Sequence, residues 1–202
     1  MNSAAGRLEA ALSADDASDR LQAALTAGTH PDTSYAGSLV ARCAIEPDFN
    51  VREMLTWALT RLPIDQVMPL VVAELESPVA QARSQALHTL SKLGDDRAWA
   101  SIHTGHLHDP DDEVARTAWR TAALFVPDDR IEQLAGEFAS ELGRGEFDVK
   151  RSLSRAFIGL GERAIPAVAG IAHDSDAPAE QAVHARATLR LFEDPEASFV
   201  LE

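Results

Sequence analysis

The sequence contains little of several residue types, and each shortage excludes a class of protein. Cys43 is the only cysteine among 202 residues, which rules out an internal disulfide and a cysteine-rich zinc site and fits a reducing compartment. Only 5% of the residues are aromatic, which argues against a β-sandwich. No stretch approaches the ~20 apolar residues that span a bilayer, and the first residues lack a secretory pattern. We therefore expect a cytoplasmic protein with no membrane segment.

Positive charge is also scarce. The formal net charge is −14, and Lys92 and Lys150 are the only lysines, so nearly all the positive charge belongs to arginine. A nucleic-acid-binding protein must neutralise phosphates, which makes nucleic acid an unlikely partner unless the basic residues are segregated. Hydrophobic residues make up 46% of the chain, and alanine and leucine are abundant among them. This composition favours closely packed helices.

A column of arginines marks an internal repeat. Its members are spaced by 31 to 35 residues: Arg20, Arg52, Arg83, Arg116, Arg151 and Arg186. The residues three and seven positions after each arginine are mostly apolar or small, as on the buried face of a helix. The pattern is strongest in the middle of the chain and weaker at both ends. Atypical terminal repeats of this kind are typical of a helical solenoid.

Helix boundaries accompany the arginine column. Aspartates lie three or four residues before four of the arginines, where a carboxylate caps the first free N–H groups of a helix: Asp16, Asp48, Asp112 and Asp148. Glycines that favour helix ends occur at Gly28, Gly94, Gly143 and Gly161. The sequence predicts an all-α fold, an α-solenoid of about six antiparallel helix pairs in a single domain over residues 1–202. The expected pairs are 3–28, 33–62, 64–93, 95–126, 128–160 and 162–192.

Paired helices with a turn aspartate and an arginine at the start of the second helix resemble HEAT repeats. The short repeats are especially similar to those of phycobilin lyases. Pro69 lies eight residues before Ser77, and Pro166 lies eight before Asp174. Both are at the same position in the first helix, where HEAT repeats often carry a kinking proline. The resemblance implies that the arginine column pairs with the turn aspartates as a structural ladder. It specifies the fold and hardly constrains the function.

A second arginine column occurs only in the C-terminal half. Arg120, Arg155 and Arg190 each lie one helical turn after a member of the first column, so each pair shares a helix face. This column is either a solvated face or a positive stripe for an acidic partner. Earlier in the chain, Trp57 and His88 occupy equivalent repeat positions. The HEAT resemblance places second helices on the inner, concave surface, so all five residues are candidate partner-binding residues.

Candidate metal and catalytic sites are weaker. His103, His106 and His108 are close in sequence, and the first two are one turn apart, but three or four converging ligands are needed for zinc. His103 also aligns with apolar positions of other repeats. The sequence contains no HExxH, Walker-type loop or strand-borne GxGxxG. We expect no catalytic residue, no metal and no cofactor.

These observations favour a non-catalytic scaffold or adaptor that binds a protein or peptide, possibly acidic, on a concave surface. Two alternatives stay open. A bilin lyase or lyase subunit is suggested by repeat similarity alone. A HEAT-like nucleic-acid-binding or DNA-repair protein would need a basic groove, for which only the second arginine column is available.

Overall fold

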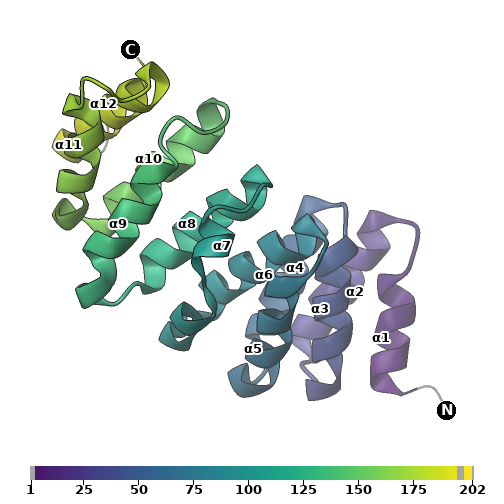
Figure 1. The fold of residues 1–202 in the computed structure, drawn as a ribbon. Helices are drawn as coiled ribbons and strands as arrows, with labels where there is room; N and C mark the ends of the chain where they lie inside the picture. The colour runs from purple at the N-terminus through teal and green to yellow at the C-terminus, as the bar shows by residue number, and fades with distance from the viewer. Residues whose placement is uncertain (1–2, 195–197, 202) are drawn as a thin grey trace. The chain divides into compact units, whose positions relative to one another are not determined.

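The computed structural model describes residues 3–194 and 198–201. Every regular element in these residues is a helix, which confirms the predicted all-α class. The chain divides into two compact units, Met1–Asp95 and Asp96–Glu202. Each unit contains three consecutive helix pairs, as the ribbon shows (Figure 1). In the described part of the chain, no helix is both long enough and apolar enough to cross a membrane.

The first unit is built from three helix pairs. Its helices are α1 (Ala4–Leu12) and α2 (Ala17–Thr29), α3 (Ala36–Ile45) and α4 (Phe49–Thr60), and α5 (Ile64–Ala73) and α6 (Ala80–Leu93). Short 3-10 turns, η1 (Thr33–Tyr35) and η2 (Glu74–Glu76), complete the connections. The second helices carry much of the core, where Leu55, Leu59, Leu87 and Leu90 are buried.

The second unit repeats the arrangement. Its helices are α7 (Thr104–Leu107) and α8 (Asp112–Phe125), α9 (Ile131–Ser140) and α10 (Phe147–Leu160), and α11 (Ile165–His173) and α12 (Ala179–Glu193). The 3-10 turns η3 (Asp96–Ser101), η4 (Asp128–Arg130) and η5 (Glu162–Ala164) precede α7, α9 and α11. Trp119, Phe138 and Phe157 are fully buried, and the rings of Phe138 and Phe157 meet edge to face.

Local sequence chemistry sets most helix boundaries. The carboxylates of Asp16 and Asp48 cap α2 and α4 by accepting N–H groups of Ser18 and Val51, as predicted. In α8 the cap is Asp111, one residue before the predicted Asp112, and α10 begins after Glu146 instead of at Asp148. The first turn still contains acidic residues in both helices, where the positive end of the helix dipole stabilises negative charge.

The predicted glycine stops are correct at three positions. Gly94, Gly143 and Gly161 have φ of 67°, 88° and 75°, which is the left-handed backbone that glycine adopts without strain. Gly28 differs because it lies within α2, one residue before the end of that helix.

The fourth helix pair departs from the pattern. The sequence predicts one first helix containing both His103 and His106, but the segment is broken into η3 and the four-residue helix α7. His103 caps α7 and is exposed, whereas His106 lies inside the helix and is buried. The other first helices contain nine or ten residues, so the fourth repeat has lost more than one turn.

Candidate interaction surfaces

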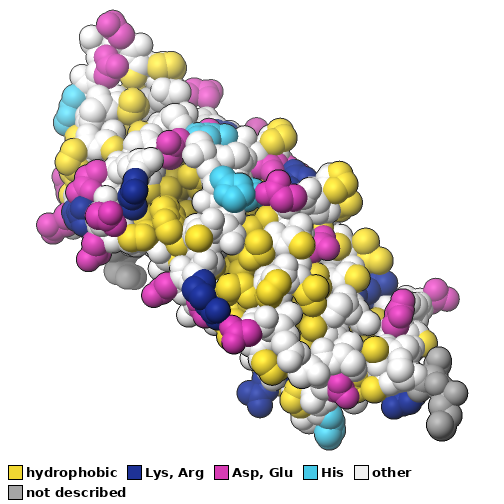
Figure 2. Space-filling model, turned by 60° about the horizontal axis from the view of Figure 1, so that its bottom comes forward, with side chains coloured by type: hydrophobic (Ala, Val, Ile, Leu, Met, Phe, Trp, Pro, Cys, Tyr) yellow, Lys and Arg dark blue, Asp and Glu magenta, His cyan; other side chains and the backbone are white. Residues whose placement is uncertain are grey.

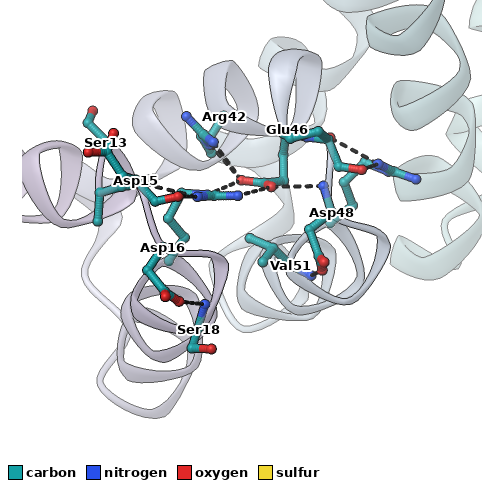
Figure 3. A network of polar contacts seen from close by, with 12 residues as sticks. Ser13, Asp15, Asp16, Ser18, Arg42, Glu46, Asp48 and Val51 are labelled. Atoms are coloured by element: carbon teal, nitrogen blue, oxygen red, sulfur yellow. Dashed lines mark hydrogen bonds and ion pairs between the residues drawn. The ribbon is translucent and has the colours of Figure 1, made fainter.

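A buried carboxylate, and not a ladder of aspartates, organises the turns of the first unit (Figure 3). The two carboxylate oxygens of Glu46 accept bonds of 2.8 Å from Nε and Nη2 of Arg20. Arg42 also binds this carboxylate, with Nη2 2.7 Å from Oε2, and the Asp48 N–H donates to Oε1 at 2.9 Å. Glu46 is fully buried and Arg20 nearly so. The network ties together α2, α3 and the start of α4.

The charge of Glu46 is maintained by its partners. Burial alone would raise its pKa, but the hydrogen bonds from Arg20, the Asp48 N–H and Arg42 lower the pKa to about 2. A buried ion pair that loses one partner leaves an uncompensated charge, which is strongly destabilising. Glu46 is therefore a structural residue, and the sequence reasoning missed it.

In the first unit the arginine column binds main-chain carbonyl groups. Arg20 Nη1 donates to the carbonyls of Ala14 and Asp15. Arg52 Nη1 donates in the same way to Glu46 and Pro47. Arg83 Nη1 donates to the carbonyl of Ser77, again six residues earlier. The column therefore satisfies the free carbonyls of the turn before each second helix. The predicted pairing of Arg52 with Asp48 is wrong, because the Asp48 carboxylate caps α4.

In the second unit only one predicted arginine–aspartate pair forms. Arg151 Nη2 lies 2.9 Å from Asp148 Oδ1. Arg116 pairs instead with Glu113 and donates to the Ser152 hydroxyl. Asp112 binds Arg144, which lies outside the column.

Arg144 joins the fourth and fifth repeats. Its Nε and Nη1 lie 2.9 Å from Asp112 Oδ1 and 2.8 Å from Glu141 Oε2. Its guanidinium also lies over the Trp119 ring and donates to the Asp109 carbonyl. Glu141 in turn binds His108. The Arg144 side chain links neighbouring repeats, which is the role that the sequence predicted for the arginine column. It is not a member of that column, so the repeat spacing did not reveal it.

The second arginine column lies exposed along the second helices of the second unit. Arg120, Arg155 and Arg190 belong to α8, α10 and α12, and all three are exposed. Arg120 donates to the Arg116 carbonyl and the Thr117 hydroxyl, and Arg190 donates to the Val200 carbonyl. Within the described residues, none of the three has a carboxylate partner.

The first column adds to this surface. Arg116, Arg151 and Arg186 lie one turn before Arg120, Arg155 and Arg190, which gives two arginines on each helix. We call these six residues the arginine face. Of these six arginines, only Arg116 and Arg151 pair with a carboxylate among the described residues. Desolvation, and to a lesser extent the positive charge of Arg116, lowers the pKa of Arg120.

Trp57 and His88 both lie in the first unit. Trp57 is 38% exposed, and its ring packs on Gly28, where an added Cβ would lie 2.2 Å from the ring. His88 Nε2 lies 2.8 Å from Glu53 Oε1, one turn before Trp57 on α4. Trp57 thus both packs locally and presents part of its ring to solvent. The arginine face belongs to the other unit.

Exposed apolar groups accompany Trp57. Ile45, Phe49 and Val79 are 65%, 63% and 47% exposed at the turns of the first unit. On the face drawn in Figure 2, hydrophobic side chains lie open to solvent between scattered acidic and basic groups.

The three clustered histidines have different surroundings. The rings of His103 and His106 lie 4.7 Å apart. His108 is held by one carboxylate of α9 and one from the residue after that helix: Nε2 lies 3.0 Å from Glu137 Oε2, and Nδ1 lies 2.5 Å from Glu141 Oε1. Burial opposes its protonation, but these carboxylates outweigh that effect and raise the pKa of His108. Both of its ring nitrogens are thus engaged within the protein.

A buried Ser–His pair resembles part of a hydrolase site by residue type. Ser154 Oγ lies 3.0 Å from His184 Nε2, and both residues are fully buried. The Gly143 N–H donates to Nδ1, so Nδ1 carries no proton and the neutral ring holds its proton on Nε2. Nε2 is also 2.9 Å from the Lys150 carbonyl. A ring in this tautomer cannot accept the serine proton, so the pair is part of the core.

Comparisons with known proteins address only the fold. Neither a protein-family model nor a curated protein matches the sequence. An engineered protein of known crystal structure is similar over 93% of this chain and 95% of its own, with 18% identity and a TM-score of 0.51. Human deoxyhypusine hydroxylase is similar over 94% of this chain and 85% of its own, with 13% identity and a TM-score of 0.49.

The complex of CpcE and CpcF of phycocyanin lyase from Nostoc is similar over 95% of this chain and 88% of that one, with 16% identity and a TM-score of 0.39. At these identities the comparisons bear on the fold alone.

Proposed function

We propose that this chain is a non-catalytic protein-binding module, and that its arginine face receives an acidic segment of a partner protein. The observation that supports the proposal is the small number of ion pairs that these arginines make. Four of the six guanidinium groups have no carboxylate partner among the described residues: Arg120, Arg155, Arg186 and Arg190. The chain as a whole has a net charge of −14, so these arginines are a local concentration of positive charge on an acidic protein.

Arginine suits this role physically. Its planar guanidinium binds carboxylates with two parallel hydrogen bonds and is more weakly hydrated than lysine, so less hydration is lost on binding. The partner segment would cross the middle of α8 and of α10 and then the C-terminal half of α12. Complementary charge would mainly increase the association rate and the selectivity for acidic segments.

The test uses a fluorescein-labelled ten-residue polyglutamate peptide as the probe. Arg120→Glu combined with Arg155→Glu should weaken its binding by roughly tenfold or more, equivalent to about 1.4 kcal/mol, and should reduce the salt dependence. The matched control is Arg61→Glu with Lys92→Glu, which makes the same charge change at exposed residues of the first unit. Equal losses in the two variants would show a net-charge effect and refute a localised surface. Binding of an oligodeoxynucleotide without binding of polyglutamate would favour the nucleic-acid alternative.

A further inference from the structure

The broken first helix of the fourth repeat leaves a cavity in the second unit. The cavity has a volume of about 370 Å³, in the usual range for ligand sites. Trp99, Ile102 and Leu107 line it from η3 and α7, and Arg130, Gln133, Leu134 and Glu137 line it from η4 and α9.

The two groups of lining residues differ in chemistry. On the side from η3 to α7, Trp99 and Ile102 are half-buried and Leu107 is buried, and the polar residues His103 and Thr104 at its rim are exposed. The side from η4 and α9 carries a polar row, Arg130, Gln133 and Glu137, spaced by three and four residues. Gln133 and Glu137 lie one turn apart on the same face of α9, and Arg130 precedes that helix in η4, roughly 10 Å from Glu137 along the backbone.

Each member of this row retains hydrogen-bonding capacity. Arg130 uses Nη1 to bind Gln133 Oε1 at 3.0 Å, and its Nε lies 3.7 Å from Asp129. Glu137 uses Oε2 to bind His108 at 3.0 Å. Arg130 Nη2, Gln133 Nε2 and Glu137 Oε1 contact no polar group of the described residues. The row therefore offers two donors at one end and a carboxylate acceptor at the other.

We propose that this cavity binds an extended peptide segment of about three residues with an acid at one end, an apolar residue in the middle and a base at the other end. Side chains alternate along an extended chain, so the outer two would face α9 while the middle one faces Trp99. The outer Cα atoms are about 7 Å apart, and their side chains reach the remaining distance to Arg130 and Glu137. This site is independent of the arginine face and goes beyond the proposed function.

The test uses blocked tripeptides and the whole chain. Acetyl-Asp-Leu-Lys-amide should bind with a Kd of about 1 mM or tighter and should shift the indole N–H resonance of Trp99. Replacing the central leucine with glycine, or lysine with aspartate, should weaken binding about fivefold or more. Glu137→Gln should weaken binding of Asp-Leu-Lys and leave Asp-Leu-Gln unaffected, because only the former brings a positive charge to that residue.

Two further variants keep the test interpretable. Asp128→Asn removes an exposed carboxylate close by but outside the cavity lining, and it should leave binding unchanged. Gln133→Leu removes a hydrogen-bond donor and should weaken binding about threefold or more. Gln133 does not bind His108, so this loss would not come from the internal contact that Glu137→Gln alters. Absence of saturable binding, or equal binding of the leucine and glycine peptides, would overturn the proposal. Neither outcome affects the polyglutamate test, which probes different helices.

Discussion

Replacing Glu46 with glutamine should destabilise the first unit far more than an ordinary surface substitution. Glutamine has nearly the same shape, so the change removes charge with little loss of packing. It leaves the buried Arg20 guanidinium without a carboxylate, because an amide offers one acceptor oxygen where Glu46 offers two. The amide nitrogen would also face donors, namely the Asp48 N–H or the arginine groups.

The size of the effect follows from burial. Removing one partner of a buried ion pair costs about 3–5 kcal/mol, compared with about 1 kcal/mol or less for exposed pairs. Glu46 is fully buried and Arg20 is 6% exposed, so we expect the free energy of unfolding to fall by about 3 kcal/mol. Glu162→Gln, at an exposed residue, is the matched control and should change stability by less than about 0.5 kcal/mol.

The assay is urea unfolding of both variants as a function of pH. The pKa of Glu46 is about 2 in the folded protein and has a reference value of 4.5, so the stabilisation is complete above pH 4.5 and is lost as the pH falls toward 2. The gap between wild type and Glu46→Gln should therefore be widest near pH 7 and should narrow below pH 4.5. If Glu46→Gln lowered the free energy of unfolding no more than Glu162→Gln does, or by the same amount at every pH, the charge of Glu46 would not be what stabilises the fold.

Two other residues give predictions of the same kind. Burial lowers the pKa of His184 to about 4, so the free energy of unfolding should fall by about 3 kcal/mol as the pH drops from 6.5 to 4. His184→Gln should remove this pH dependence. The same dependence of stability on pH in that variant would contradict the prediction. Gly28→Ala would place a methyl group against the Trp57 ring, so it should cost about 1–3 kcal/mol and shift Trp57 fluorescence, whereas Gly37→Ala, with open space around it, should do neither.

The repeated part of the fold was readable from the sequence because it depends on local signals. The caps Asp16 and Asp48, the glycine stop Gly94 and the apolar spacing of the second helices each act within a few residues. These signals placed the helix pairs close to their observed bounds. The broken helix before His106 was not predicted, because its apolar and polar residues still match the helical spacing.

The polar networks were only partly predictable. Glu46 lies between the helices of one pair but receives its main partner from a residue 26 positions earlier, and no local pattern specifies that contact. Arg144 similarly binds Asp112 across 32 positions. The resemblance to HEAT repeats implied that Arg20 and Arg52 pair with aspartates, whereas in the structure these arginines bind Glu46 and main-chain carbonyls.

The most direct test of the proposed function is to observe the arginine side chains during binding. Nuclear magnetic resonance of the arginine Nε–Hε groups, recorded while polyglutamate is added, reports each guanidinium separately. We expect the largest chemical-shift changes at the four arginines that have no carboxylate partner: Arg120, Arg155, Arg186 and Arg190. The resonances of Arg61 and of the buried Arg20 should change little. Shifts of equal size at Arg61, or no shifts at the four arginines while polyglutamate binds, would contradict the proposed function.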